Sequence, residues 1–140
     1  MRRLIVVWAL AASGCATIRP PDLEELKPAV EAFHQRVRWK DFRAAAELMV
    51  PEHRDAFIKA RAKLKDEKDL FVTDFQLEDA KLTPDRNVAL AVSKLSWYRL
   101  PSMTETTATV TSTFVWRENQ WMLECQDDGP FDDLRAASKP

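Results

Sequence analysis

Apolar residues recur at helical spacing through the first half of the chain. After Asp22, a residue type that caps helices, the first apolar stripe predicts a helix that begins near Lys27. Asp41 then caps a short second helix over 42–49, and Pro51 opens a third, because proline fits the first helical turn. The stripes are Leu26, Val30, Phe33 and Val37 in the first helix and Phe57, Ala60 and Leu64 in the third.

The period of the pattern changes to two in the second half of the chain. A charged run from Lys65 to Asp69 separates the halves and predicts a solvated turn. Alternating apolar residues then predict four strands, separated by turns that contain Pro, Asn, Asp or Ser. The predicted strands cover 71–82, Val88 to Trp97, 104–116 and 121–125.

The second strand and the third strand carry further detail. Val88, Leu90 and Val92 alternate, but Leu95 and Trp97 fall in the opposite phase, which predicts a bulge or bend near Ser93. The third strand has an apolar face and a threonine face that can meet solvent, a partner or a second copy of the chain. Its threonines are Thr107, Thr109, Thr111 and Thr113. Helices followed by an antiparallel meander predict an α+β fold, with N-terminal helices packed on a curved four-stranded antiparallel sheet.

Residues 1–14 have the layout of an export signal. Arg2 and Arg3 precede an uncharged apolar run over 4–12, and two small residues follow it. The run is shorter than the ~20 residues that a membrane-spanning helix needs, which disfavours an uncleaved anchor. Ala12-Ser13-Gly14-Cys15 resembles the lipobox of bacterial lipoproteins. The alternative is an ordinary signal cleaved after Gly14, which leaves Cys15 as a free thiol.

The lipobox resemblance implies that the thiol of Cys15 is acylated and anchors the chain to a membrane. Ala16, rather than aspartate, follows the cysteine, which in Gram-negative lipoproteins implies the outer membrane, with the domain facing the periplasm. We therefore expect four parts. They are a signal peptide over 1–14, a lipidated cysteine and linker over 15–21, one domain over 22–128 and a flexible acidic tail over 129–140.

Composition excludes several classes of function. Loss of residues 1–14 leaves 126 residues, enough for one domain. It also reduces the 21 basic residues to 19 against 22 acidic ones, and this balance does not favour nucleic acid as a partner. Gly129 is then the single glycine, so a glycine-rich phosphate loop is excluded. Cys125 is expected to be a small buried residue.

The order of these elements is similar to that of nuclear-transport-factor-2-like domains. The similarity rests on Phe33 with Trp39-Lys40-Asp41-Phe42, then Ala44 to Leu48, and on the closing hairpin from Phe114 to Leu123. It implies a cystatin-like cone, in which a curved sheet wraps helices around a tapered apolar pocket. Members include ketosteroid isomerases, dehydratases and non-catalytic binding modules, so the resemblance leaves the function open.

Candidate pocket residues follow from this resemblance and from residue chemistry. They are His34, Trp39, Trp97, Tyr98 and Trp116. Each has a structural alternative: the histidine can flank the core, the tyrosine can lie at the rim, and the tryptophans, with Trp121, can fill the core. His34 and His53 lie nineteen residues apart and no Cys-x-x-Cys motif exists, so we expect no metal and no cofactor.

No acid–base pair matches a catalytic motif, so the sequence favours a non-catalytic interaction or assembly module over an enzyme. The expected partners are the membrane, an envelope protein and, through the sheet face, a second copy of the chain. Binding of a small apolar ligand or lipid in the cone is the first alternative. An isomerase- or dehydratase-like enzyme that uses Tyr98 or His34 is the second.

Overall fold

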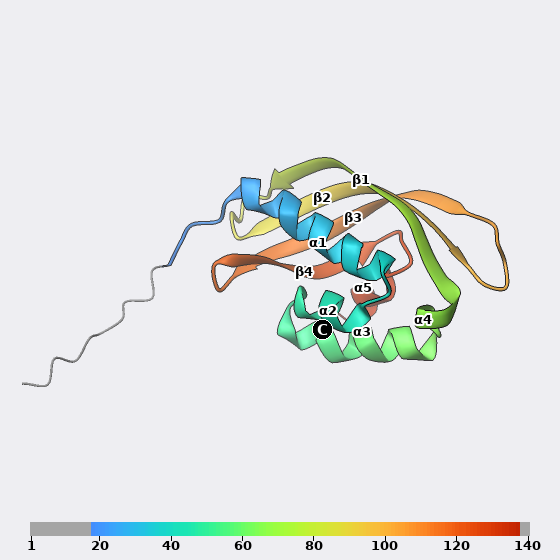
Figure 1. The fold of residues 1–140 in the computed structure, drawn as a ribbon. Coiled ribbons are helices and arrows are strands. Elements are labelled where there is room, and N and C mark those ends of the chain that lie inside the picture. The colour runs from blue at the N-terminus through green and yellow to red at the C-terminus, as the bar shows by residue number, and fades with distance from the viewer. Residues whose placement is uncertain (1–17, 138–140) are drawn as a thin grey trace, which may run out of the picture.

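The computed structural model describes residues 18–137, so residues 1–14 and Cys15 lie outside the described part of the chain. Helices come first and strands follow (Figure 1). The helices are η1 Leu23–Glu25, α1 Leu26–Arg38, α2 Phe42–Glu47, α3 Pro51–Lys63, α4 Asp66–Asp69 and, after the strands, α5 Asp133–Ala137. The strands are β1 Leu70–Leu82, β2 Val88–Arg99, β3 Thr106–Arg117 and β4 Gln120–Asp127.

The four strands form one antiparallel meander in the order β1-β2-β3-β4. α1 crosses one face of the curved sheet, and α2 and α3 lie beside its β4 edge (Figure 1). The segment before α3 continues this edge, since Val50 N donates to Leu123 O at 2.9 Å and Leu123 N donates to Leu48 O at 3.0 Å. The prediction of an α+β fold with N-terminal helices on a curved antiparallel sheet is confirmed.

The helices begin where their capping residues stand. The side chain of Asp22 accepts a hydrogen bond from Glu24 N, and that of Asp41 accepts one from Ala44 N at 3.1 Å. Pro51 occupies the first turn of α3. The buried stripe of α1 is the predicted one, extended by His34.

The predicted phase change in β2 is wrong. The strand keeps one phase, with Ala89, Ala91, Ser93 and Leu95 all buried. Small alanine and serine side chains face the core there, while larger valine and leucine side chains lie on the outer face. The prediction assigns the larger and more apolar side chains to the core face. The register shifts lie instead in β1, which bulges on either side of 74–77.

The C-terminal segment belongs to the core. Phe131 is fully buried and Leu134 is 1% exposed, so the prediction of a flexible tail from residue 129 is wrong for 129–135. The ring of Phe131 lies 5.9 Å from that of Phe33 and 5.8 Å from that of Phe57, measured between centroids. α5 packs between α3 and β4 and closes the core on that side.

A buried ionic cluster holds this closure in place. Arg61 is 3% exposed and Asp66 is fully buried, and they form a 2.7 Å ion pair. Asp66 also pairs with Arg99 of β2, and Arg61 pairs with Asp133 of α5. Because Asp66 is buried, the prediction of a solvated turn over 65–69 is wrong at this position.

Arg61→Met is expected to lower the free energy of unfolding by about 3–5 kcal/mol, because it removes the buried partner of both Asp66 and Asp133 and leaves Asp66 only the partly exposed Arg99. Urea unfolding measures the change. Lys63→Met, at an exposed position of the same helix, is the matched control. Equal effects of the two substitutions would contradict a structural role for the buried pair.

Phe131→Ala is expected to cost about 3–5 kcal/mol of the free energy of unfolding, since it opens a cavity between aromatic rings. Met103→Ala removes an apolar side chain that is 77% exposed, and it should change stability by less than about 0.5 kcal/mol. The same denaturation experiment compares them. A flexible C-terminal segment would make the two variants indistinguishable.

Candidate functional site

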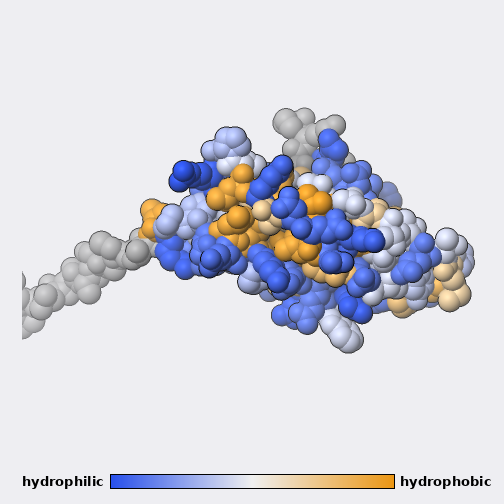
Figure 2. Space-filling model, turned by 90° about the horizontal axis from the view of Figure 1, so that it is seen from above, coloured by the Kyte–Doolittle hydropathy of each residue, from blue (hydrophilic) through white to orange (hydrophobic). Residues whose placement is uncertain are grey.

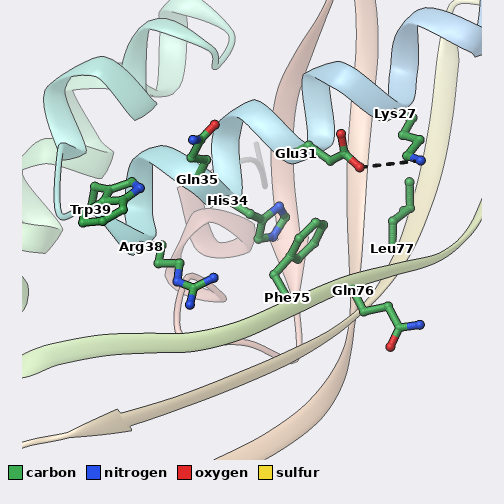
Figure 3. Close-up of a pocket in the computed structure, with 9 residues that line it drawn as sticks. All are labelled: Lys27, Glu31, His34, Gln35, Arg38, Trp39, Phe75, Gln76 and Leu77. Carbon is green, nitrogen blue, oxygen red and sulfur yellow. Dashed lines mark ion pairs between the residues drawn. The ribbon is translucent and has the colours of Figure 1, made fainter.

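A groove of about 690 Å³ runs between α1 and the edge strand β1. Figure 2 looks onto this side of the molecule and shows apolar surface in the middle, bordered by hydrophilic surface. Figure 3 shows the lining side chains, which come from one face of α1 and from the middle of β1. They are Lys27, Glu31, His34, Gln35, Arg38 and Trp39 on the helix side and Phe75, Gln76 and Leu77 on the strand side.

The helical wall of the groove is a second stripe along α1. Its residues recur at three- and four-residue steps, one position after the buried stripe, and so form a neighbouring row on the helix surface. Lys27 and Glu31 are four residues apart and form an exposed ion pair at 3.8 Å. Trp39, which follows the last residue of α1, is 76% exposed at one end of the row.

The opposite wall is the part of β1 between its two register shifts. Phe75 and Leu77 pair with inward-facing residues of β2 and are only half-buried, because β1 has no neighbouring strand on its outer side. Gln76 between them is exposed. Bulges curve a strand, so this pair of bulges turns the two apolar side chains toward α1.

His34 forms the floor of the groove. Its ring stacks on that of Phe75 with 4.0 Å between centroids, and the side chain is 1% exposed (Figure 3). Nδ1 lies 2.8 Å from the carbonyl oxygen of Val30, which can only accept, so Nδ1 carries the proton. Burial lowers the pKa of His34 from 6.5 to about 4. The imidazole is therefore neutral at pH 7.

A buried polar network extends from His34 into the sheet. Gln126 Nε2 lies 3.1 Å from His34 Nε2 and donates to it, and it also donates to Ser112 Oγ at 3.0 Å. Among the described residues, Gln126 Oε1 and Ser93 Oγ are buried without a hydrogen-bond partner. A side chain at Gly129 would place its Cβ 3.0 Å from Gln126 Oε1 and 2.8 Å from a Val110 methyl carbon, so this position accommodates only glycine without rearrangement.

Sequence patterning missed Gln126. Alternation from Trp121 and Leu123 predicts that Cys125 faces inward, but a register shift between β3 and β4 moves the inward position to Gln126. Cys125 is only half-buried, so the prediction of a buried residue is wrong. Burial still raises the pKa of the Cys125 thiol, which disfavours the reactive thiolate.

The interior of the cone is filled by side chains. Aromatic residues from α1, α3, β3 and the C-terminal segment occupy it, each at most 1% exposed. They are Phe33, Phe57, Phe114 and Phe131. The groove beside α1 is therefore an open channel at the margin of this core.

The structure brings two of the five candidate pocket residues together. His34 and Trp39 both line the groove, and the exposure of Trp39 excludes the core-packing alternative for it. Trp97 packs half-buried against the core, and Tyr98 stacks on Phe71 with 4.9 Å between centroids. Trp116 lies near the opposite end of the sheet, where it contacts Trp121 edge-to-face.

A second groove, of about 570 Å³, lies between α2, α3 and α4 and is rich in basic residues. Its central cations already have partners in the protein. Lys40 Nζ lies 3.4 Å from the centroid of the Phe71 ring and donates to Glu67 O at 3.0 Å, and Arg61 belongs to the ionic cluster described above. These groups stabilise the turns around α4.

In the part of the chain that the structure describes, no set of three or more His, Cys, Asp or Glu side chains is placed to hold a metal ion. Across the same residues, every helix is too short or too polar to cross a membrane.

Protonation of His34 is expected to destabilise the fold in acid. A folded-state pKa below the unfolded value stabilises the protein above about pH 6.5, and this contribution is lost as the pH falls toward 4. Between pH 7 and pH 4.5, the free energy of unfolding of the wild type should fall by about 2–3 kcal/mol more than that of His34→Gln. Urea unfolding at a series of pH values tests this, and parallel pH profiles for the two proteins would contradict the burial of a neutral imidazole.

Three solved structures resemble this chain in fold. A SEC-C motif-containing protein from Rhodopseudomonas palustris has a TM-score of 0.60 and 14% identity, with 78% of this chain and 82% of that chain covered. An NTF-2-like protein of unknown function from Shewanella oneidensis has a TM-score of 0.56 and 11% identity, and the match covers 74% of this chain and 94% of that chain. A putative Ca/calmodulin-dependent kinase II association domain from Exiguobacterium sibiricum has a TM-score of 0.57 and 11% identity, and the match covers 79% of this chain and 94% of that chain.

No protein-family model matches the sequence. The search of curated proteins also gave no match. At such low identity the structural resemblances show the fold alone: this chain has the α+β architecture of nuclear-transport-factor-2-like proteins.

Proposed function

We propose that this protein is a bacterial envelope lipoprotein, anchored through acylated Cys15 to the outer membrane and facing the periplasm. Its domain acts as a non-catalytic interaction module, and the groove between α1 and β1 is the surface that contacts a protein partner. The observation that carries this proposal is Trp39, a large apolar side chain that stands 76% exposed at the end of a groove with apolar side chains in one wall.

The composition of the groove supports a protein partner. Interfaces combine an apolar centre with a polar rim, and tryptophan and arginine are enriched among the residues that dominate binding energy. Here Phe75 and Leu77 supply the centre, and Arg38 lies beside Trp39 on the rim (Figure 3). The groove is open along its length, so it fits the side chains of another polypeptide better than it encloses a small molecule.

The surroundings of His34 give an enzyme no support. Its two ring nitrogens are engaged by the Val30 carbonyl and the Gln126 amide, and neither partner is a carboxylate. A general base must reach the proton that it removes, and here the ring is buried beneath Phe75. Tyr98 lies outside the groove, so it does not complete an acid–base pair with His34.

Binding of a small apolar ligand or a lipid in the same groove is the second candidate. The observation that favours it is the volume of about 690 Å³, which falls within the usual range for ligand sites of ~300–1,000 Å³. A fluorescent fatty acid distinguishes the two candidates. Saturable binding that Leu77→Gln abolishes would favour the ligand.

Site-specific crosslinking in native membranes tests the interaction module. A photo-crosslinking residue at Gln35, which is exposed in the groove, should capture a partner, whereas one at Lys59, exposed on α3, should not. Trp39→Ser should reduce the product from position 35 by about tenfold or more, as expected for loss of an interface anchor. The melting temperature should not change, because the side chain is mostly in solvent.

The products separate the possible outcomes. Equal capture at positions 35 and 59, or capture that ignores Trp39→Ser, would overturn the groove as the contact site. A product of twice the mass of the chain from a probe at the exposed Thr109 of β3 would instead support the homodimer through the outer sheet face. Release of Cys15→Ser protein from the membrane fraction supports the lipid anchor, and its retention contradicts it.

A further inference from the structure

We infer that the end of the domain nearest the linker rests against the lipid bilayer, so that the lipid anchor fixes the orientation of the domain as well as its location. This inference rests on the proposed acylation of Cys15. The surface, called here the membrane-facing end, consists of Ile18, Leu23 and Leu82 with the hairpin turns 83–87 and 118–119.

Arg19 is bound to the body of the domain. Its backbone N–H donates to Asn119 Oδ1 at 2.8 Å, and its guanidinium donates to Asn119 O at 3.2 Å. Its carbonyl oxygen accepts from Trp116 Nε1 at 3.1 Å, and its side chain also pairs with Glu25 at 3.0 Å. The linker expected over 15–21 is therefore attached to the β3–β4 hairpin from Arg19 onward.

This attachment leaves a very short tether. Four residue steps separate Cys15 from Arg19, and they span at most about 14 Å when fully extended. An acylated cysteine lies where its acyl chains enter the hydrocarbon, and each headgroup layer outside the hydrocarbon is about 5–8 Å thick. Arg19 is thus held within several ångströms of the headgroup surface, and the hairpin that binds it is held there too.

Three apolar side chains are exposed at this end, among the polar residues of the turns. Ile18 is 91% exposed, and Leu23 and Leu82 are each 36% exposed. η1, which begins at Leu23, contacts β1, and Leu82 is the last residue of that strand. Trp116 N also donates to Asn87 O, which brings the β1–β2 turn to the same end as Arg19. Contact with the bilayer covers these apolar side chains.

The opposite end of the domain then points into the aqueous compartment. In Figure 1 the chain enters at one end of the molecule, and the β2–β3 loop and α4 lie at the other. α1 begins near the entry and has 13 residues, so it carries the chain about 20 Å away from the membrane-facing end. Trp39, which follows α1, therefore lies away from the bilayer.

Depth-dependent fluorescence quenching tests this orientation in the full-length acylated protein. In a Cys125→Ser background, Arg86→Cys places a fluorophore in the β1–β2 turn, and Ser102→Cys places one in the β2–β3 loop; both positions are exposed. The protein is reconstituted in phosphatidylethanolamine and phosphatidylglycerol vesicles that contain a headgroup-labelled quencher. Quenching at position 86 should exceed that at position 102 by about threefold or more, since the headgroup layer is far thinner than the domain is long.

A longer tether is the matched control. Insertion of about ten Gly and Ser residues between Thr17 and Ile18 adds up to about 35 Å of reach, and it should remove the difference between positions 86 and 102. Equal quenching at both positions in the protein with its own linker would overturn the inference, as would an undiminished difference after insertion. Vesicle flotation that Cys15→Ser leaves unchanged would instead refute the anchor, and with it the proposed function.

Discussion

The guanidinium of Arg61 joins parts of the chain that the sheet alone does not hold together. It pairs with Asp66, which lies in α4 between α3 and β1, and with Asp133 in α5. It also donates to the carbonyl oxygen of Pro130. Its central carbon lies 4.9 Å from the ring centroid of Phe131 and 5.1 Å from that of Phe57. A buried charge is costly to leave unpaired, so these segments hold their positions only together. The C-terminal segment is thereby kept inside the cone.

This closure determines where a site can exist. A nuclear-transport-factor-2-like cone with an open interior presents a deep pocket, but here Phe131 and its neighbours occupy that space. The concavity that remains lies beside α1, where β1 is an edge strand bent by two bulges. Its shape is that of a channel with an exposed tryptophan, and this geometry supports the proposed contact with another chain more than enclosure of a substrate.

Local patterns in the sequence predicted the elements well, because helix caps and changes of period act over a few residues. The positions that patterning missed depend on tertiary contacts. Asp66 is buried because arginines from α3 and β2 converge on it, and Gln126 faces inward because a bulge shifts β4 by one position. Trp39 lies in solvent although tryptophan usually packs, because it follows the last residue of α1 and stands outside the buried stripe that ends at Val37. Neither a convergence of charges nor a bulge changes the periodicity of apolar residues in the sequence, so neither can be predicted from it.

The polar network behind the groove lowers the stability of the fold, so packing does not explain its presence. Gln126 Oε1 and Ser93 Oγ have no hydrogen-bond partner among the described residues, and a buried unsatisfied polar atom costs about 1–3 kcal/mol. Apolar side chains of similar size would avoid this cost, so packing alone does not account for a neutral histidine, an amide and two serines on one inner face. Departures from good packing concentrate at functional sites. The network ends at His34, whose ring forms the floor beneath Phe75, and it holds that floor in one orientation. The proposed contact surface gains from such a rigid base beneath Phe75, because less side-chain freedom is lost on binding.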